Sequence, residues 1–376
     1  MNAKNIFLVI VSFILVSCNQ KQNSTQLIDN DLFGTLVDGK EVKLFTLQNK
    51  NGVVTQITNY GGRVVNLWTP DKNGNFDDIV LGYETMEGYL KSNEIYYGAL
   101  IGRYGNRIGK GMFHLNDTVY KLALNNDENH LHGGIDGFNN VVWEASQIDE
   151  QTLELRYLSP DMEEGYPGNL KVKVKYQLTD DNELKTEYWA TTDKPTPVNL
   201  TQHSFFNLKG VGNGDVLDNI LQINADFYTP VDKGLIPTGD IAPVEGTPMD
   251  FRNPTAVGKR INDDFEQLKF GLGYDHNWVL NQSDSGLTFA AKVVEPVSGR
   301  TIKVYTNEPG LQVYTGNFLD GSDSGKGGKT FGYRGAICLE TQHFPDSPNK
   351  PDFPTTILNP GDEYYSICVY KFGVEK

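Results

Sequence analysis

The sequence predicts a single large, mostly β domain. Hydrophobic and polar residues alternate with a period of two in several stretches, which is typical of half-buried antiparallel strands. Turn signals such as Asp-Gly and Asn-Gly separate these stretches, and the 376-residue chain contains 39 Gly. Helical periodicity is scarce, and no Pro/Ser-rich linker or internal repeat divides the body of the chain. We therefore expect one antiparallel architecture.

The N-terminal residues resemble a bacterial lipoprotein signal sequence. Lys4 is followed by an apolar run at residues 6–16, which is too short to span a bilayer comfortably and is typical of a secretory signal. The run ends with Leu-Val-Ser-Cys at residues 15–18, a pattern that predicts cleavage before Cys18 and lipidation of this cysteine. The alternative is a simple secretory signal followed by an incidental cysteine.

The chain accordingly divides into three parts. We expect residues 1–17 to be a signal peptide, and residues 18–30, which are mostly Gln, Asn, Ser and Thr, to be a flexible tether. Residues 31–376 are expected to form the folded domain. Lipidation of Cys18 would anchor this domain in the bacterial cell envelope, on the periplasmic side or at the cell surface. That anchor is the only membrane contact we expect.

Strands and helices can be placed within the body of the chain. Alternation is clearest at residues 153–157, 171–178 and 184–190. In residues 171–178 the apolar side chains point to one face and the lysines to the other, as in a strand that is buried on one side. The best helical candidates are two short segments, Thr85 to Leu90 and Asp264 to Leu268.

Charge and cysteine content exclude several classes of protein. The chain contains 33 Lys+Arg against 48 Asp+Glu, and its formal charge of -15 would repel a nucleic acid or an anionic membrane surface. The charge favours an uncharged substrate over a sugar phosphate. After Cys18 only Cys338 and Cys368 remain, so we expect two buried free thiols, with a disulfide between them left open.

Histidines concentrate in a few polar segments. Five of the six histidines lie in segments that are richer in polar and aromatic residues than packing requires, namely His130, His132, His203, His276 and His343. The segments are residues 102–108 with 129–134, 199–208, 274–277 with 310–317, and 339–349. Each histidine alone is more often structural than catalytic, but their concentration indicates a site.

A metal site is not expected from these residues. His130 and His132 would face the same way on one strand, which invites a metal interpretation. However, a catalytic zinc needs at least a third ligand at a defined place, and no candidate is evident. The polar residues 262–264 could hold a structural calcium, but a solvated surface is the expected reading.

Glu340 follows an apolar run, residues 336–339, that is typical of a buried strand. A carboxylate at the end of such a strand would be partly desolvated, which raises its pKa and its basicity toward neutral pH. The alternative is a salt bridge from Glu340 to an arginine such as Arg334 or Arg107.

The polar segments together resemble the aldose 1-epimerase, or galactose mutarotase, family. The resemblance extends in the right order from about Phe33 to about Phe372, and the string Glu-Thr-Gln-His-Phe-Pro-Asp-Ser-Pro-Asn that begins at Glu340 is highly specific. Gln202 and Phe205 stand where the family commonly has Asn and Tyr. The matching motifs are Gly-Arg-x-x-Asn-Arg-Ile at 102–108, Leu-His-Gly-Gly at 131–134, Asn-x-Thr-x-His at 199–203 with Phe-Asn-Leu at 206–208, Tyr-Asp-His at 274–276, Gln-x-Tyr-Thr-Gly-Asn at 312–317, and the string at 340–349.

The resemblance implies both a fold and a reaction. The fold would be a β-supersandwich, a single-domain and largely antiparallel structure whose concave face holds a free hexose. The reaction would be the interconversion of the α and β anomers by ring opening and reclosure. This chemistry needs one base and one acid, so neither a cofactor nor a metal is expected. We expect a monomer that acts on an aldose such as glucose or galactose.

The resemblance also assigns roles to particular residues. Glu340 matches the general base and His203 the general acid of the family. A carboxylate nearby is expected to raise the pKa of His203 and so favour its protonated form. Arg107 and His132 match sugar-binding positions, with Asn106 beside them. Asp275 and Gln312 are expected to contact sugar hydroxyls, because carboxylates and amides suit a neutral sugar.

Two alternatives to this activity remain at this point. A glycoside hydrolase would use two carboxylates, such as Glu340 and Asp275, on either side of a scissile bond. A catalytically idle carbohydrate-binding protein could share the same fold and bind sugar without accelerating anomer exchange. Polarimetry with a nonreducing glycoside as control distinguishes the three functions.

Overall fold

The computed structural model describes residues 25–283 and 286–375. The predicted signal peptide, the lipidation site Cys18 and the tether up to residue 24 lie outside these described residues. The backbone of Ile28 exchanges two hydrogen bonds with the side chain of Gln56, at 2.8 and 2.9 Å. Attachment to the domain therefore begins before residue 31. Within the described ranges, none of the helices has the length and apolar character needed to cross a bilayer.

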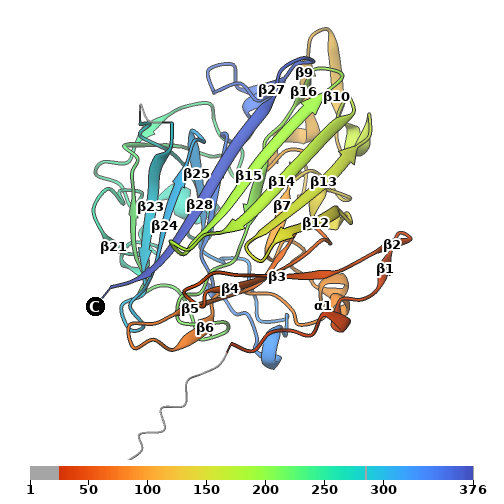
Figure 1. Cartoon of the computed structure of the whole chain (residues 1–376). Coiled ribbons are helices and arrows are strands. Elements are labelled where there is room, and N and C mark those ends of the chain that lie inside the picture. Colours follow the sequence, from red (N-terminus) through yellow and green to blue (C-terminus); the bar gives the residue numbers. More distant parts are fainter. Residues whose placement is uncertain (1–24, 284–285, 376) are drawn as a thin grey trace, which may run out of the picture.

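A nine-stranded antiparallel sheet forms one wall of the molecule (Figure 1). In order across the sheet, its strands are β12 (Glu144–Asp149), β13 (Thr152–Ser159), β14 (Leu170–Leu178), β15 (Glu183–Thr192), β28 (Tyr364–Val374), β24 (Arg300–Thr306), β23 (Thr288–Val294), β18 (Ile220–Ile223) and β21 (Thr255–Ala256). The three stretches of predicted alternation form β13, β14 and β15, which confirms them as strands. In β14 the apolar residues Val172 and Val174 are buried, whereas Lys171 is exposed on the opposite face.

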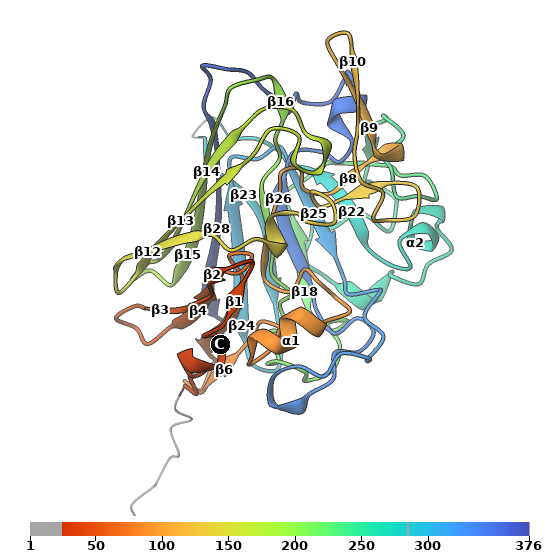
Figure 2. The same cartoon turned by 90° about the vertical axis from the view of Figure 1, so that its right-hand side faces the viewer.

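A five-stranded antiparallel sheet packs against the inner face of this wall (Figure 2). In order, its strands are β20 (Ala242–Pro243), β19 (Phe227–Thr229), β22 (Asp275–Val279), β25 (Gly310–Tyr314) and β26 (Cys338–Gln342). Trp278 and Leu311 from this sheet share one hydrophobic core with Val174 and Tyr370 from the large sheet. The Tyr370 hydroxyl also donates a 2.6 Å hydrogen bond to the carbonyl of Leu339. The two sheets therefore form a sandwich around a common core.

A four-stranded sheet closes one end of the sandwich (Figure 1). It contains β3 (Leu44–Gln48), β4 (Val54–Thr58), β5 (Val64–Pro70) and β6 (Phe76–Asp78). The remaining strands form antiparallel pairs: β1 (Leu36–Val37) with β2 (Lys40–Glu41), β7 (Ala99–Ile101) with β17 (Thr201–His203), β8 (Arg107–Ile108) with β11 (His130–Leu131), β9 (Met112–Leu115) with β10 (Thr118–Lys121), and β16 (Thr196–Pro197) with β27 (Ile357–Leu358).

Helices are few and short, as the sequence predicts. Within residues 25–283 and 286–375 the two α-helices are α1 (Met86–Lys91) and α2 (Glu266–Phe270), and both lie where helical segments were expected. Thr85 caps α1 because its hydroxyl accepts a hydrogen bond from the Gly88 backbone. Single 3-10 turns occur at η1 (Asn30–Leu32), η2 (Gly109–Gly111), η3 (Phe138–Asn140), η4 (Glu163–Gly165), η5 (Val257–Lys259), η6 (Lys326–Gly328) and η7 (Ser347–Asn349).

The two cysteines and the polar residues 262–264 can also be located in this fold. Cys338 and Cys368 are both buried and both free, so the default reading of two buried thiols is confirmed. Residues 262–264 are exposed, and Asp264 forms an ion pair with Lys269. This is the solvated surface that was expected there.

Candidate active site

Strict alternation along the inner sheet divides its side chains between the core and a cleft. On β26, Leu339 points into the core and Glu340 to the opposite face. Gln312 on β25 lies directly beside Glu340 in the antiparallel register, while its neighbours Leu311 and Val313 are in the core. Asp275 on β22 occupies the same face as Gln312. One face of three neighbouring strands therefore gathers the predicted polar residues.

Two short strand pairs bring the remaining predicted residues to this face. His203 ends β17, which lies against β26. Arg107 begins β8, whose partner β11 ends just before His132. The cleft is lined by Asn106, Arg107, His132, His203, Asp275 and Glu340, together with aromatic residues. Gln312 reaches the group through Asp275, because its side-chain amide donates a 2.7 Å hydrogen bond to Asp275 Oδ1.

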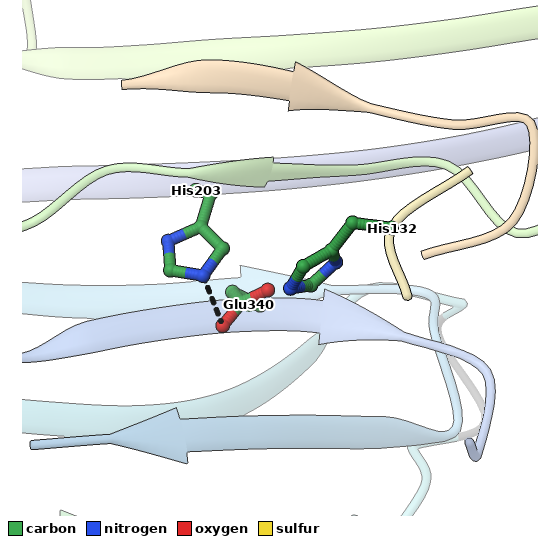
Figure 3. Close-up of side chains that lie close together, drawn as sticks. All are labelled: His132, His203 and Glu340. Carbon is green, nitrogen blue, oxygen red and sulfur yellow. Dashed lines mark ion pairs between the residues drawn. The ribbon is translucent and has the colours of Figure 1, made fainter. Parts of the chain in front are cut away.

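The Glu340 carboxylate lies between two imidazole rings (Figure 3). His203 Nε2 is 3.5 Å from Glu340 Oε1, and both side chains are almost fully buried. One ring nitrogen from His132, one from His203 and one carboxylate oxygen of Glu340 all lie within 4.8 Å of one another. Neither Arg334 nor Arg107 forms an ion pair with Glu340 in the described part of the chain. The salt-bridge alternative for Glu340 is therefore not what the structure shows.

Burial determines the protonation of the Glu340–His203 pair. It raises the pKa of Glu340 well above the usual 4.5, and the charge of Asp275 adds to this effect while Arg107 opposes it. Burial also lowers the pKa of His203 to about 4, although Asp275 acts in the opposite direction. The expectation that the pKa of His203 is raised is therefore wrong for the free site. Desolvation outweighs the nearby carboxylates, so burial favours the neutral imidazole of His203 and the protonated carboxyl group of Glu340.

The hydrogen bonds of His132 fix its tautomer. His132 Nδ1 accepts a 3.1 Å hydrogen bond from the Asn106 backbone N–H, so a neutral His132 ring must carry its proton on Nε2. Burial keeps the ring neutral because it lowers the pKa of His132 well below 6.5. A histidine that binds a metal through Nε2 needs a proton on Nδ1 to donate. His132 is thus arranged to donate a hydrogen bond, and it does not fit the role of a metal ligand.

Arg107 and Asp275 form a buried pair beside the Glu340–His203 pair. Asp275 Oδ2 lies 3.4 Å from Arg107 Nη2, and both side chains are less than a tenth exposed. Arg107 Nε donates a 3.0 Å hydrogen bond to the side chain of Asn126. Two buried acceptor atoms in the cleft, Glu340 Oε2 and Gln312 Oε1, have no hydrogen-bond partner among the described residues. Such acceptors suit a ligand that presents hydroxyl donors.

The turn that contains His132 depends on glycine. His132 has a φ of 53°, and Gly133 follows with a φ of 88°. A Cβ atom on Gly133 would lie 1.8 Å from the carbonyl oxygen of Gly102, so only glycine fits there. This turn reverses the direction of His132 relative to His130. The sequence predicted that both rings face the same way on one strand, and that prediction is wrong.

Three of the five clustered histidines do not line the cleft. His130 bonds to the Tyr166 hydroxyl at 2.7 Å and to the Ala123 carbonyl at 2.8 Å. His276 alternates with Asp275 on β22 and so points to the other face, where its Nδ1 accepts from the Asp275 backbone. His343 pairs with Glu308 at 2.5 Å. The clustering therefore located the site, but it did not identify which histidines face it.

Aromatic residues support the two histidines of the cleft. The Tyr96 ring lies edge-on to His132 with a centroid distance of 4.7 Å, and it stacks beside His203 at 5.9 Å. Phe205 stacks on the other side of His203 at 4.7 Å. Gln202 points away and donates hydrogen bonds to Gly98 and Ser204. The two departures from the family pattern therefore leave His203 well positioned.

Sequence reasoning missed several residues of the cleft, and four of them bear on its chemistry or shape. They are Glu94, Tyr96, Asn126 and Phe318. Asn126 stands close to the His130 segment and shares its high Asn content, which is the only local signal for it. Glu94, Tyr96 and Phe318 lie in loops whose sequence has no periodicity, so their position depends on distant contacts.

Comparisons with known proteins show the family of this chain. The family model described as aldose 1-epimerase matches residues 43–371. A galactose mutarotase of Rattus norvegicus is 44% identical over 348 residues, covering 92% of this chain and 99% of the relative. An aldose 1-epimerase of Escherichia coli strain K12 is 37% identical over 340 residues, covering 90% and 97%. Among solved structures, a GalM/aldose epimerase homologue from C. elegans superposes with a TM-score of 0.83 at 30% identity, covering 89% of this chain and all of that one.

These matches extend over nearly the whole described domain, and they agree with both the antiparallel sandwich and the order of the motifs. The predicted fold, a largely antiparallel β-supersandwich of the galactose mutarotase type, is confirmed. This chain belongs to the aldose 1-epimerase family.

Proposed function

We propose that this chain is an isomerase, an aldose 1-epimerase that interconverts the α and β anomers of free hexoses such as glucose and galactose. The observation that carries this proposal is the 3.5 Å approach of His203 Nε2 to Glu340 Oε1 in a buried cleft. One acid and one base on either side of a hemiacetal are sufficient for the reaction. Membership of the aldose 1-epimerase family supports the same activity.

Ring opening needs two proton movements. Glu340 as carboxylate takes the proton from the C1 hydroxyl, whose electrons form the C1 carbonyl as the bond from C1 to the ring oxygen breaks. His203 as imidazolium gives its proton to the departing ring oxygen. After rotation about the C1–C2 bond, His203 takes that proton back, and Glu340 returns its proton to the aldehyde oxygen as the ring closes on the other face. Each group ends as it began.

The neutral form of the pair corresponds to the middle of this cycle. Burial favours the carboxylic acid and the neutral imidazole, which is the state that accompanies the open-chain aldehyde. The states with a closed sugar ring, at the start and the end of the cycle, need the charged form of the pair, a carboxylate and an imidazolium. Arg107 favours it because its charge lowers the pKa of Glu340. Arg107 therefore offsets part of the desolvation penalty on the charged form of the pair.

The other predicted residues would bind and orient the sugar. His132 donates through Nε2–H, and Asp275 offers an acceptor while Gln312 orients it through their hydrogen bond. Arg107 supports negative charge on the sugar oxygens, and Asn106 fixes both neighbours because it bonds to the His132 ring and to the Arg107 backbone. Holding the sugar between acid and base adds an orientation contribution to the rate.

We further propose that the reaction uses no metal or cofactor. The tautomer of His132 supports this proposal, because the ring donates where a metal ligand would have to accept. Incubation with EDTA, followed by desalting, is expected to leave the rate of anomer exchange unchanged.

Polarimetry on freshly dissolved α-D-glucose or α-D-galactose tests the proposed function. We expect the optical rotation to reach its equilibrium value much faster than in buffer, with no change for methyl α-D-galactoside, which cannot open. Release of reducing ends from an aryl glycoside or a disaccharide would instead indicate a glycoside hydrolase. Sugar binding by calorimetry without faster exchange would indicate an idle binding protein.

We also propose that the protein is a lipid-anchored monomer of the bacterial cell envelope. The Leu-Val-Ser-Cys sequence at residues 15–18 supports the anchor, and a position outside the inner membrane would give access to newly released sugars. Globomycin, which blocks lipoprotein signal cleavage, is expected to cause the precursor to accumulate. Unchanged processing would contradict lipidation at Cys18. Light scattering of the mature domain tests the monomer.

A further inference from the structure

The loop between α1 and β7 is held rigidly over the cleft. Arg63 donates hydrogen bonds to the carbonyls of Ile95 and Tyr97, at 2.9 and 3.1 Å. From the other side, Asp323 accepts a 3.2 Å hydrogen bond from the backbone N–H of Glu94. Contacts from two distant parts of the chain thus fix the backbone on both sides of Glu94. The loop is therefore an ordered part of the cleft wall.

Glu94 is one of four carboxyl residues that line this cleft, with Asp127, Asp275 and Glu340. Its Oε1 accepts a 2.9 Å hydrogen bond from the Tyr96 backbone N–H, which orients the side chain. Its Oε2 makes no hydrogen bond or ion pair to any described residue. The mechanism above assigns no role to this group. An oriented carboxyl group on a cleft-lining residue, with one oxygen that has no partner, suits a hydroxyl donor of the ligand.

No cation among the described residues forms an ion pair with Glu94. Arg107 is already engaged by Asp275, and Lys233, which also lines the cleft, is exposed to solvent. The buried guanidinium of Arg63 lowers the pKa of Glu94, but burial dominates and raises that pKa to about 7. Above pH 7 the cleft therefore contains a carboxylate at Glu94 that no cation pairs with.

We propose that Glu94 is a substrate-contacting specificity residue that accepts a sugar hydroxyl and excludes aldoses that carry a negative charge, such as uronates. This proposal rests on the proposed epimerase function and names the substrate class of the same site. A neutral aldose satisfies the free oxygen of Glu94 with a donor. An anionic aldose meets like charge in a partly desolvated cleft, where repulsion is stronger than in water.

The test compares D-galactose with D-galacturonate in wild type and in Glu94→Gln. The Gln side chain keeps an acceptor for the Tyr96 backbone but removes the charge. At pH 8 we expect Glu94→Gln to reduce the kcat/KM ratio of galactose to galacturonate about tenfold, which corresponds to about 1.4 kcal/mol. Calorimetry should show the same change in the ratio of the two dissociation constants, independently of turnover.

Glu87→Gln is the matched control. Glu87 is exposed on α1 and pairs with Lys91, so this variant removes the same charge outside the cleft. We expect it to leave the galactose to galacturonate ratio within about twofold of wild type, which is within the range of a surface substitution. A folded Glu94→Gln whose ratio also stays within twofold would overturn the proposal. Wild type that exchanges no anomers would instead refute the epimerase function.

Monodeoxy sugars test the hydroxyl contact separately. Removing one hydroxyl from galactose should weaken wild-type binding at the contacted position, and Glu94→Ala should abolish the penalty for that one sugar only. This non-additivity is the signature of a direct pair. If Glu94→Ala lowers the affinity for every deoxy sugar and for galactose by the same factor, Glu94 does not contact the substrate.

Discussion

His203 Nε2 lies 3.5 Å from Glu340 Oε1, and burial shifts the pKa values of the two groups in opposite directions, downward for His203 and upward for Glu340. Both side chains are buried, and desolvation penalises an imidazolium and a carboxylate alike. Burial therefore favours the neutral form of each group. This relationship determines the first two predictions.

Glu340→Gln and His203→Asn should each remove most of the activity. Each substitution deletes a proton-transfer group but keeps a polar side chain of similar size. A positioned acid or base contributes about 10² to 10⁴ in rate, and we expect losses in that range. Polarimetry on fresh α-D-galactose measures the loss, with thermal unfolding to show that the variants fold. A rate near wild type in either folded variant would remove that residue from the mechanism.

The pH profile should follow the shifted pKa of His203. The pair works with one proton, and a second proton enters when His203 is protonated while Glu340 is still the acid. Because the pKa of His203 is lowered to about 4, kcat/KM should hold on acidification to about pH 5 and fall near pH 4. Initial rates by polarimetry, with the buffer reaction subtracted, give this profile. A limb near pH 6.5, the ordinary value for histidine, would contradict the assignment.

The tautomer of His132 can be observed directly. The hydrogen bond from the Asn106 backbone to Nδ1 predicts a neutral ring with its proton on Nε2 from pH 6 to 8. In a protein labelled with 15N-histidine, the two ring nitrogens of His132 should have well-separated shifts, with the protonated signal at Nε2. The signals of His132→Gln identify the residue by difference. A proton on Nδ1 would contradict the donor role that we assign to Nε2.

Asp275→Asn should weaken sugar binding more than it slows proton transfer. Asp275 accepts from Gln312 and pairs with Arg107, whereas the reacting pair is Glu340 and His203. Removing the carboxylate leaves Arg107 buried without its partner, which changes the orientation of both binding residues. We expect KM for galactose to rise about tenfold, equivalent to the loss of about 1.4 kcal/mol. A change confined to kcat would instead place Asp275 in the proton-transfer step.

The Glu308–His343 pair should make stability depend on pH. The pKa of His343 is raised from 6.5 because Glu308 outweighs burial. The contribution of His343 to the free energy of unfolding is therefore complete below pH 6.5 and is lost as pH rises through the folded pKa. The pKa of Glu308 is lowered from 4.5 by His343, so its contribution is present above pH 4.5 and is lost on further acidification. The pair thus stabilises the fold most between pH 4.5 and 6.5.

His343→Gln tests this window. In urea unfolding at pH 5.5 we expect a loss of about 3 kcal/mol, the lower end for a buried pair that loses one partner, and a smaller loss at pH 9. His114→Gln is the control, because His114 is exposed on β9. An equal loss at both pH values would show that His343 stabilises by packing alone.

Local patterns predicted the strands, and chain-wide motifs predicted the site. The alternation at residues 171–178 specifies β14 because each side chain's burial follows from its place in the strand. The apolar run at 336–339 made Glu340 a candidate base, with a salt bridge as the alternative, and the motif at 339–349 assigned its role through the resemblance to a family. The pKa direction of His203 could not be predicted, because it depends on how completely distant segments bury the pair.

Contacts between distant residues also explain the omissions. Glu94 reaches the cleft because Arg63 and Asp323, far from it in sequence, hold its loop. The rings of His130 and His132 point in different directions because Gly133 permits a turn. The period-two alternation of a strand does not hold through such a turn. A single sequence contains no signal for either arrangement.

Because of the alternation on β25 and β26, the inner sheet supplies both core residues and cleft residues. This limits the sequence changes that the enzyme can tolerate in these strands. Leu311 and Leu339 hold the interior while Gln312 and Glu340, one position along, meet the sugar. A one-residue insertion in either strand would exchange the two sets and destroy folding and activity together. New substrate preferences should therefore arise by variation in the loops around the sheet, which can be altered without disturbing the framework beneath.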